Sequence, residues 1–172
     1  RDAAHDRDNS EKFIKAGIRT HRVLAIVDLE ETLDGNGKKI PIKEAKKRKL
    51  IPAKMHPVIQ IRAFGTKERV YHIRIGKGIN PYTGTYERVE QTLEDARMMV
   101  AQELGKDPQK FSDKDYLRWF AEILGKQVAK IRKLGLYHGY LTEHNLTLDC
   151  RIVDLDSIED IKKKAAEEET PA

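Results

Sequence analysis

The amino-acid sequence predicts an α+β domain, and three observations lead to this prediction. Two short apolar runs, residues 23–27 and 58–64, are typical of strands, and the second alternates between apolar and polar positions after its first two residues. Two longer segments repeat apolar residues every three or four positions, which is the period of a helix. The length of 172 residues suits one domain with a hydrophobic core.

The first helix is predicted at residues 10–16. Gly17 is well placed to end it, because glycine readily adopts the left-handed conformation of a C-terminal cap. The strand at 23–27 follows, and the tetrapeptide Asp-Gly-Asn-Gly at 34–37 is a strong turn signal. The basic run at 43–49 is interpreted as a solvated helix or loop, since basic and acidic residues interleave over most of the chain.

The middle of the chain is predicted to be mainly helical. Asn, Pro and Gly residues indicate a loop at 80–84. Of the two helices that follow, the second spans 116–134, with Ser112 and Asp115 in capping-box register before it and Gly135 after it. The earlier of these two helices is marked by apolar residues at helical spacing: Val89, Leu93, Ala96, Val100 and Leu104.

The C-terminal part is predicted to contain short strands and turns. Residues 135–139 turn the chain, and Asp149 marks a tight turn between two short strands, of which 151–154 is the second. The tail at 160–172 alternates lysine and glutamate blocks, so it is expected to form an exposed helix or to be frayed.

Composition excludes several classes of protein. With 39% hydrophobic and 35% charged residues, the chain is too apolar for a disordered one and should be highly soluble. Cys150 is the single cysteine, which excludes an internal disulfide and a cysteine zinc cluster. The longest purely apolar stretch is too short to span a bilayer, so no membrane partner and a cytoplasmic location are expected. Aromatic residues are only 6%, which makes nucleic acid an unlikely partner.

One segment carries recognisable chemistry. Residues 138–145 read His-Gly-Tyr-Leu-Thr-Glu-His-Asn, and Asp154 follows Asn145 at a predicted strand end. In protein kinases a loop of the form His-x-Asp-x-x-x-x-Asn precedes a hairpin that ends in Asp, and this Asn and Asp bind magnesium. Amide and carboxylate oxygens are ligands that Mg²⁺ accepts. Asn145 and Asp154 are therefore predicted metal ligands; the alternative is that Asn145 caps a turn and Asp154 is a surface carboxylate.

The chain resembles the selenoprotein O family, kinase-like proteins that transfer AMP to protein hydroxyl groups. The family's loop, His-Gly-x-x-Asn-Thr-Asp-Asn, is similar to residues 138–145, and its metal Asp has the spacing of Asp154. Residues 10–24 resemble the family's segment Ser-Glu-x-x-x-x-x-Gly-Ile-Pro-Thr-Thr-Arg-x-Leu, which makes Glu11 the glutamate that pairs with an ATP-anchoring lysine. Arg62 and Arg69 match two arginines that contact the nucleotide phosphates.

The chain departs from the family at three places. His144 stands where the family has the Asp proposed as catalytic base, and Tyr140 stands at the Asp position of ordinary kinases. His144 or Glu143 is the candidate substitute base, because a neutral histidine can accept a hydroxyl proton. Asp156 is interpreted as a turn residue or a second carboxylate. A glycine-rich loop and a strand lysine would both precede Arg1, so an N-terminal region is expected to be missing from the numbered sequence.

The resemblance implies a protein-kinase-like α+β architecture. Residues 1–75 would form a partial N-terminal lobe with antiparallel strands, 76–160 a mainly helical C-terminal lobe and 161–172 a charged tail, with ATP in the cleft between the lobes. The implied function is transfer of AMP, dependent on ATP and Mg²⁺, to Ser, Thr or Tyr hydroxyls of a protein substrate. Kinase-type phosphotransfer and a non-catalytic ATP-binding module are the alternatives, with a basic RNA-binding domain a distant one.

Overall fold

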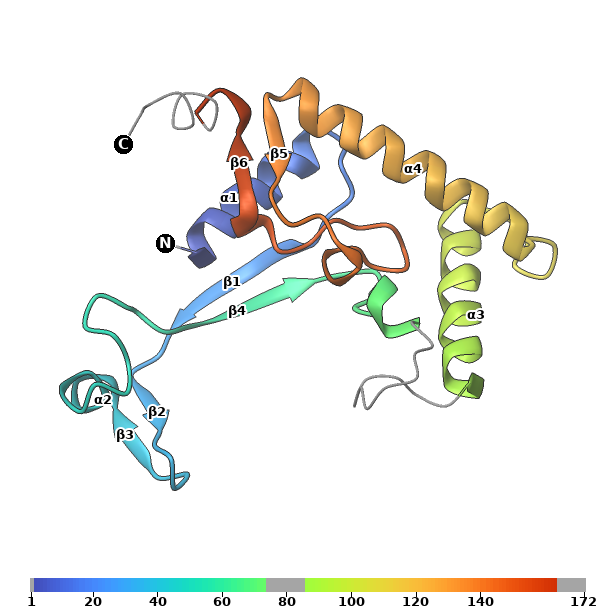
Figure 1. The fold of residues 1–172 in the computed structure, drawn as a ribbon. Helices are drawn as coiled ribbons and strands as arrows, with labels where there is room; N and C mark the ends of the chain where they lie inside the picture. Colours follow the sequence, from blue (N-terminus) through green and yellow to red (C-terminus); the bar gives the residue numbers. More distant parts are fainter. Residues whose placement is uncertain (1, 74–85, 164–172) are drawn as a thin grey trace.

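The structure is a computed structural model in which residues 2–73 and 86–163 are described. These residues form a mixed α+β arrangement of helices and small antiparallel sheets (Figure 1), which confirms the predicted fold class at this level. The predicted loop at 80–84 and the end of the tail lie outside the described residues. The elements are α1 (Asp2–Lys15), β1 (Arg22–Asp28), β2 (Glu31–Leu33), β3 (Lys39–Pro41), α2 (Ile42–Lys47), β4 (Val58–Ala63), the 3-10 helix η1 (Val70–Ile73), α3 (Tyr86–Glu103), α4 (Asp113–Lys133), β5 (Leu136–His138), the 3-10 helices η2 (Glu143–Asn145) and η3 (Leu155–Ser157), and β6 (Ile158–Asp160).

Helix α1 ends as predicted but begins much earlier than residue 10. Gly17 has a φ of 67°, and its backbone N donates to the Ile14 carbonyl at 3.0 Å, as expected of a C-terminal cap. The residues that α1 buries toward the rest of the molecule are mostly polar, namely Asp6, Asn9 and Ser10. Before Phe13 this buried face has no apolar residue and hence no hydrophobic period, which explains why the sequence did not predict the first turns.

Strands β1 and β4 form a two-stranded antiparallel sheet beside α1. Val27 pairs with Ile59 and Ala25 with Ile61, with a bulge between Val23 and Ala25. The chain between these strands, residues 29–57, protrudes from the rest of the molecule and carries β2, β3 and α2 (Figure 1). The turn predicted at 34–37 is confirmed there, since the Gly37 N donates to the Asp34 carbonyl at 2.9 Å.

The helices α3 and α4 support the C-terminal segment. The capping box of α4 is confirmed, with the Ser112 side chain accepting from the Asp115 backbone N. Residues of α4, among them Ile131, share a hydrophobic core with Phe13 of α1 and with Ile152 and Leu155. This core holds the segment of the predicted loop against both α1 and α4. Among the described helices, none has the length and apolar character needed to cross a bilayer.

Two local predictions in the C-terminal part are corrected by the structure. Gly135 turns the chain with a φ of 72°, but the next three residues form β5, which pairs with β6. Residues 151–154 are not a regular strand, because only Ile152 makes bridges, with Leu146 and Thr20. The physical reason is that the residues at both ends of this stretch, Cys150 and Asp154, have positive φ angles that interrupt extended backbone.

Candidate functional site

The loop that follows β5 is attached to the residue before Asp154 by a histidine side chain. His138 Nε2–H donates to the Val153 carbonyl at 2.9 Å, and its Nδ1 accepts from the Tyr140 backbone N at 3.1 Å. A carbonyl can only accept, so this arrangement fixes the ring as the tautomer with its proton on Nε2. Because both ring nitrogens are occupied, His138 positions the loop rather than reacting.

Asn145 lies at the end of η2 and is buried. Its Nδ2 donates to the Tyr140 carbonyl at 2.9 Å, and its own carbonyl accepts from the Val153 N at 3.0 Å. Within the described part of the chain, its Oδ1 has no hydrogen-bond partner. Since Val153 directly precedes Asp154, the structure brings Asn145 and Asp154, nine positions apart in sequence, to neighbouring places.

Asp154 has a strained backbone and an unpaired side chain. Its φ of 64° and ψ of 50° lie in the left-handed region, where a residue other than glycine costs about 1 kcal/mol. No residue in the described ranges forms a hydrogen bond or ion pair with its carboxylate. Strained backbone of this kind tends to occur at functional sites, where the surrounding structure enforces it.

The donor set of Asn145 and Asp154 fits a magnesium ion better than a metal held by protein ligands alone. In the described ranges no three His, Cys, Asp or Glu side chains gather in a way that could hold a metal. An amide oxygen and a carboxylate are hard ligands, and Mg²⁺ commonly takes one or two of these and completes its shell with phosphate oxygens and water. Whether both side chains share one ion stays a prediction.

Arg69 is brought to the same loop. It forms an isolated antiparallel bridge with Thr147, and its Nη1 donates to the His144 carbonyl at 2.6 Å. The guanidinium therefore lies beside η2, one residue from Asn145 along the chain. Of the two arginines predicted to contact phosphates, Arg69 is the one in direct contact with the loop.

Arg62 reaches the site indirectly, through an acidic residue that the sequence analysis missed. Asp6 of α1 is buried, and its Oδ1 accepts from the Leu155 backbone N at 2.9 Å. Its Oδ2 accepts from His21 Nε2 at 2.8 Å and Gln60 Nε2 at 3.0 Å, and lies 3.1 Å from Arg62 Nη2. Asp6 thus connects β4 to the residue that follows Asp154.

The surroundings of Asp6 keep it charged. Burial works against the ionised carboxylate, but the hydrogen bond and charge of His21, the charge of Arg62 and the Leu155 N–H together outweigh burial, so the pKa of Asp6 lies below its usual value. The only signal in the sequence is spacing: Asp6, Asn9, Ser10 and Phe13 fall on one face of a helix.

Glu11 is not brought to this site. Its carboxylate pairs with Arg22 Nε at 3.3 Å, and 40% of its side chain is exposed. At 3.6 residues per turn, Glu11 points roughly 140° away from Asp6 around α1. The acidic side chain of α1 that contacts the Asp154 turn is therefore Asp6, five positions earlier.

The two candidate bases both lie in η2. The His144 ring is exposed and packs against the Tyr71 ring of η1, with ring centroids 3.8 Å apart and planes inclined by 32°. Glu143 is half-buried beside it. Both residues belong to the same 3-10 turn as Asn145.

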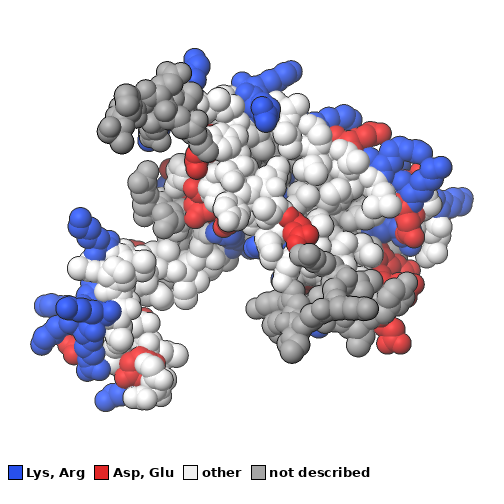
Figure 2. All heavy atoms as spheres, in the orientation of Figure 1, with Lys and Arg blue, Asp and Glu red and all other residues white. Residues whose placement is uncertain are grey.

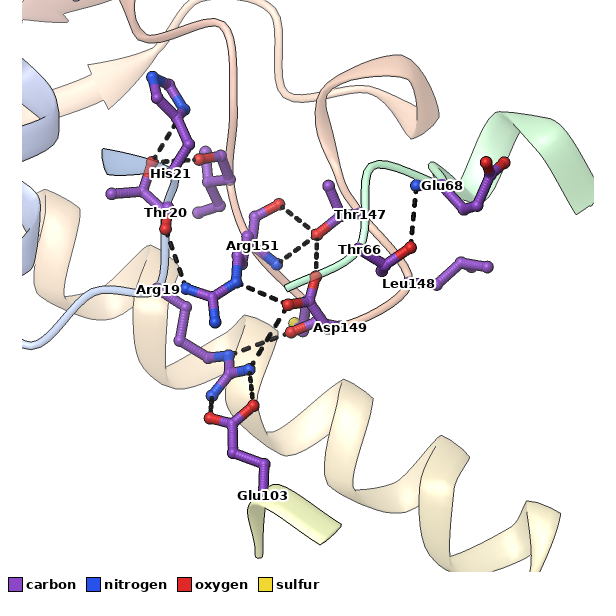
Figure 3. A network of polar contacts seen from close by, with 12 residues as sticks. Arg19, Thr20, His21, Thr66, Glu68, Glu103, Thr147, Leu148, Asp149 and Arg151 are labelled. Carbon is purple, nitrogen blue, oxygen red and sulfur yellow. Dashed lines mark hydrogen bonds and ion pairs between the residues drawn. The ribbon is translucent and has the colours of Figure 1, made fainter. Parts of the chain in front are cut away.

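A buried carboxylate behind the loop supports the site (Figure 3). Asp149 accepts from Thr147 Oγ1 at 2.5 Å and from Arg151 Nε at 2.6 Å, and its carbonyl accepts from Arg19 Nε at 3.0 Å. Arg19 also makes a two-pronged ion pair with Glu103 of α3, at 2.5 and 2.7 Å. These contacts tie the turn at 147–151 to the α1–β1 connection and to α3.

The backbone of Gly65 also passes close to the Asp149 carboxylate. A Cβ atom built on Gly65 would lie 2.2 Å from Asp149 Oδ2, so the segment after β4 passes the carboxylate at a distance that only glycine permits. The Leu148 N donates to the Glu68 carbonyl at 2.8 Å in the same place. Cys150 is fully buried in this turn, and burial raises the pKa of its thiol to about 12, which disfavours the thiolate form.

Comparisons of the chain with protein-family models, with curated proteins and with solved structures gave no match. The function of the chain is therefore inferred from the geometry around Asn145 and Asp154.

Proposed function

We propose that this chain belongs to a kinase-like, magnesium-dependent transferase that moves AMP from ATP to a Ser, Thr or Tyr hydroxyl of a protein substrate. The observation that carries the proposal is the hydrogen bond from the Val153 N to the backbone carbonyl of Asn145, which joins the segment of Asn145 to the residue before Asp154. The backbone of Asp154 is in the left-handed conformation, which raises the free energy of the folded protein. This donor pair suits a metal–phosphate complex better than a structural metal.

The proposed roles follow from the contacts. Asn145 Oδ1 and the Asp154 carboxylate would hold magnesium, which when bound neutralises phosphate charge. Arg69, attached to the loop through the His144 carbonyl, would bind phosphate oxygens, a task suited to a permanently charged planar group. Arg62 donates a hydrogen bond from Nε to Gln60 and forms an ion pair with Asp6 through Nη2. Its Nη1 is the atom that we propose binds a phosphate oxygen.

His144 and Glu143 are the proposed acceptors of the substrate hydroxyl proton. Their position in η2 beside Asn145 supports this assignment, since the acceptor must be within hydrogen-bond reach of the reacting hydroxyl. Group transfer from ATP depends chiefly on positioning and charge stabilisation. Replacement of the family's aspartate would therefore affect the transfer rate more than nucleotide binding.

The kinase-like architecture is part of the same proposal. It is supported by the order of the elements: helix α1, the antiparallel strands β1 and β4, the long helices α3 and α4, and then the loop with Asn145 and the turn with Asp154. The contact of α1 with η3 also brings the first helix against the turn that carries Asp154.

Label transfer from ATP tests the proposal. The complete gene product is incubated with Mg²⁺ and a mixture of protein acceptors, with ATP labelled at either the α- or the γ-phosphate. Transfer of the α-label supports AMP transfer. Transfer of the γ-label alone would instead indicate phosphotransfer, the alternative reaction, which the kinase-like spacing of His138 and Asn145 also suits. Asp154→Asn should abolish transfer, whereas Asp28→Asn, at a carboxylate whose side chain is 72% exposed, should not. Absence of ATP binding in the wild type would overturn the proposal.

A further inference from the structure

The positive charge of this protein is concentrated in one protruding element. Residues 38–54, here named the basic arm, contain eight lysine or arginine residues and one acidic residue, a formal charge of +7. The whole chain carries +5, so the remainder carries −2. Figure 2 shows lysine and arginine gathered over β3 and α2, away from the body of the molecule.

Among the residues that the structure describes, the lysines of the basic arm have no acidic partners. Arg48 pairs with Glu44 at 2.7 Å, but none of the seven lysines has a carboxylate within ion-pair distance among the described residues. Six of them are exposed and Lys46 is half-buried. Crowding like charges costs free energy, which an anionic partner bound to the arm would offset.

Exposed apolar side chains accompany these lysines. Leu33, Leu50 and Met55, in the arm or next to it, are 62%, 54% and 52% exposed. The small core of the arm is already built from Ile40, Ile42 and Ala45, which are buried. The exposed three are therefore not needed to hold the arm together, and a partner that fits this surface must accept apolar as well as cationic side chains.

This mixture favours a protein partner over nucleic acid or lipid. A phosphate backbone attracts lysine but gains little from leucine or methionine, and residues 29–57 contain no Phe, Tyr or Trp on which bases could stack. The six residues of α2 make fewer than two turns, too little for a helix lying in a lipid interface. We propose that the basic arm docks an acidic, leucine-containing segment of the protein substrate, an inference that rests on the proposed transfer function.

The position of the arm suits binding of the protein substrate rather than a direct role in the transfer reaction. It is inserted between β1 and β4, and the six residues of β4 lead from it to the connection beside Asp149. At ~3.3 Å per residue, β4 separates the arm from the loop by roughly 20 Å. An extended substrate chain covers that distance in about six residues, so the docked acidic segment would lie at least that far in sequence from the modified hydroxyl.

Binding measured without nucleotide tests this inference separately from the transfer reaction. A fluorescent peptide of Glu-Glu-Leu repeats is titrated by anisotropy, at about physiological ionic strength, with the wild type and with Lys39→Glu/Lys43→Glu/Lys47→Glu. We expect the triple variant to bind at least about 30-fold more weakly. The matched control, Lys12→Glu/Lys114→Glu/Lys133→Glu, changes three exposed lysines outside the arm and should change affinity less than about threefold.

A second variant tests the apolar part of the surface. Leu33→Ser/Leu50→Ser/Met55→Ser should weaken the peptide about tenfold with unchanged circular dichroism, because apolar area is lost but no charge. Equal affinity of wild type and the triple lysine variant would overturn the inference. Tighter binding of an RNA duplex, or of phosphatidylserine vesicles, than of the peptide would also overturn it, in favour of that class of partner. Failure of the transfer assay alone would leave all these readouts intact.

Discussion

The Asp6 carboxylate accepts a hydrogen bond from the Leu155 backbone N at 2.9 Å, across 149 positions of sequence. Through this bond α1 holds the residue that directly follows Asp154. The same carboxylate pairs with Arg62 of β4, so one buried charge connects the helix, the sheet and the strained turn. The stability of that turn should depend on Asp6 being ionised.

Replacing Asp6 by Asn should destabilise the protein by about 2–4 kcal/mol at pH 7, because His21 and Arg62 lose their charged partner. The folded-state pKa of Asp6 is lowered, so its contribution is complete above the unfolded value of about 3.9 and is lost as pH falls through the lower folded value. Urea unfolding at several pH values measures this. The difference between wild type and variant should shrink below about pH 4; a constant difference would contradict the assignment.

The Gly65→Ala variant should lose about 2 kcal/mol of stability or more, since its Cβ would meet Asp149 Oδ2 at 2.2 Å. In an Asp149→Ala background the same change should cost at least about 1 kcal/mol less, and a double-mutant cycle of unfolding free energies measures this coupling. Gly125→Ala is the control: it lies in α4 with no atom near its Cβ, and it should be neutral or stabilising.

Two substitutions at Asp154 should separate stability from binding. Asp154→Gly should be about 1 kcal/mol more stable than Asp154→Ala, because only glycine adopts a φ of 64° without cost. If the proposed function holds, both variants lose magnesium-dependent ATP binding, measured by calorimetry. Lys49→Gly, at an exposed residue with a φ of 59°, should gain stability and keep ATP binding. Equal stability of the Gly and Ala variants would speak against backbone strain.

Arg69→Ala should weaken ATP binding at least about tenfold, because the guanidinium beside the loop is proposed to bind phosphate. Arg69→Lys should recover only part of the affinity, since lysine lacks the planar fork. Unchanged ATP affinity in Arg69→Ala would remove the residue from the nucleotide site. Arg62→Ala should weaken ATP binding and, unlike Arg69→Ala, also lower stability, because it takes a partner from buried Asp6.

The substitution His144→Asn should lower the transfer rate while leaving ATP affinity nearly intact, if His144 accepts the hydroxyl proton. If the histidine is only a remnant of the family's aspartate, His144→Asp should instead raise the rate. Single-turnover transfer and equilibrium ATP binding, measured on the same preparations, distinguish these outcomes. An unchanged rate in both variants would exclude His144 from the mechanism.

The predicted site and the structural site coincide in part. Asn145 and Asp154 were predicted from motif spacing, and Arg69, His144 and Glu143 from the family resemblance; in the structure all five lie in or beside the segment from β5 to Asp154. Glu11 was assigned from the same resemblance as the partner of a lysine that precedes Arg1, which stays a prediction; in the structure Glu11 pairs with Arg22. A motif predicts well that residues close in sequence lie close in space, because the short chain between them limits their distance.

The sequence by itself determined several helix caps and turns. The Gly17 cap, the turn at 34–37 and the Ser112 capping box depend on the chemistry of a few adjacent residues, and each appears in the structure. Only the tertiary structure decided which polar groups are buried together. Asp6 with Leu155 and Gly65 with Asp149 are contacts between distant parts of the chain. The sequence does not show which residues form such contacts, because a hydrogen bond or a close approach depends on the positions of two distant segments in space.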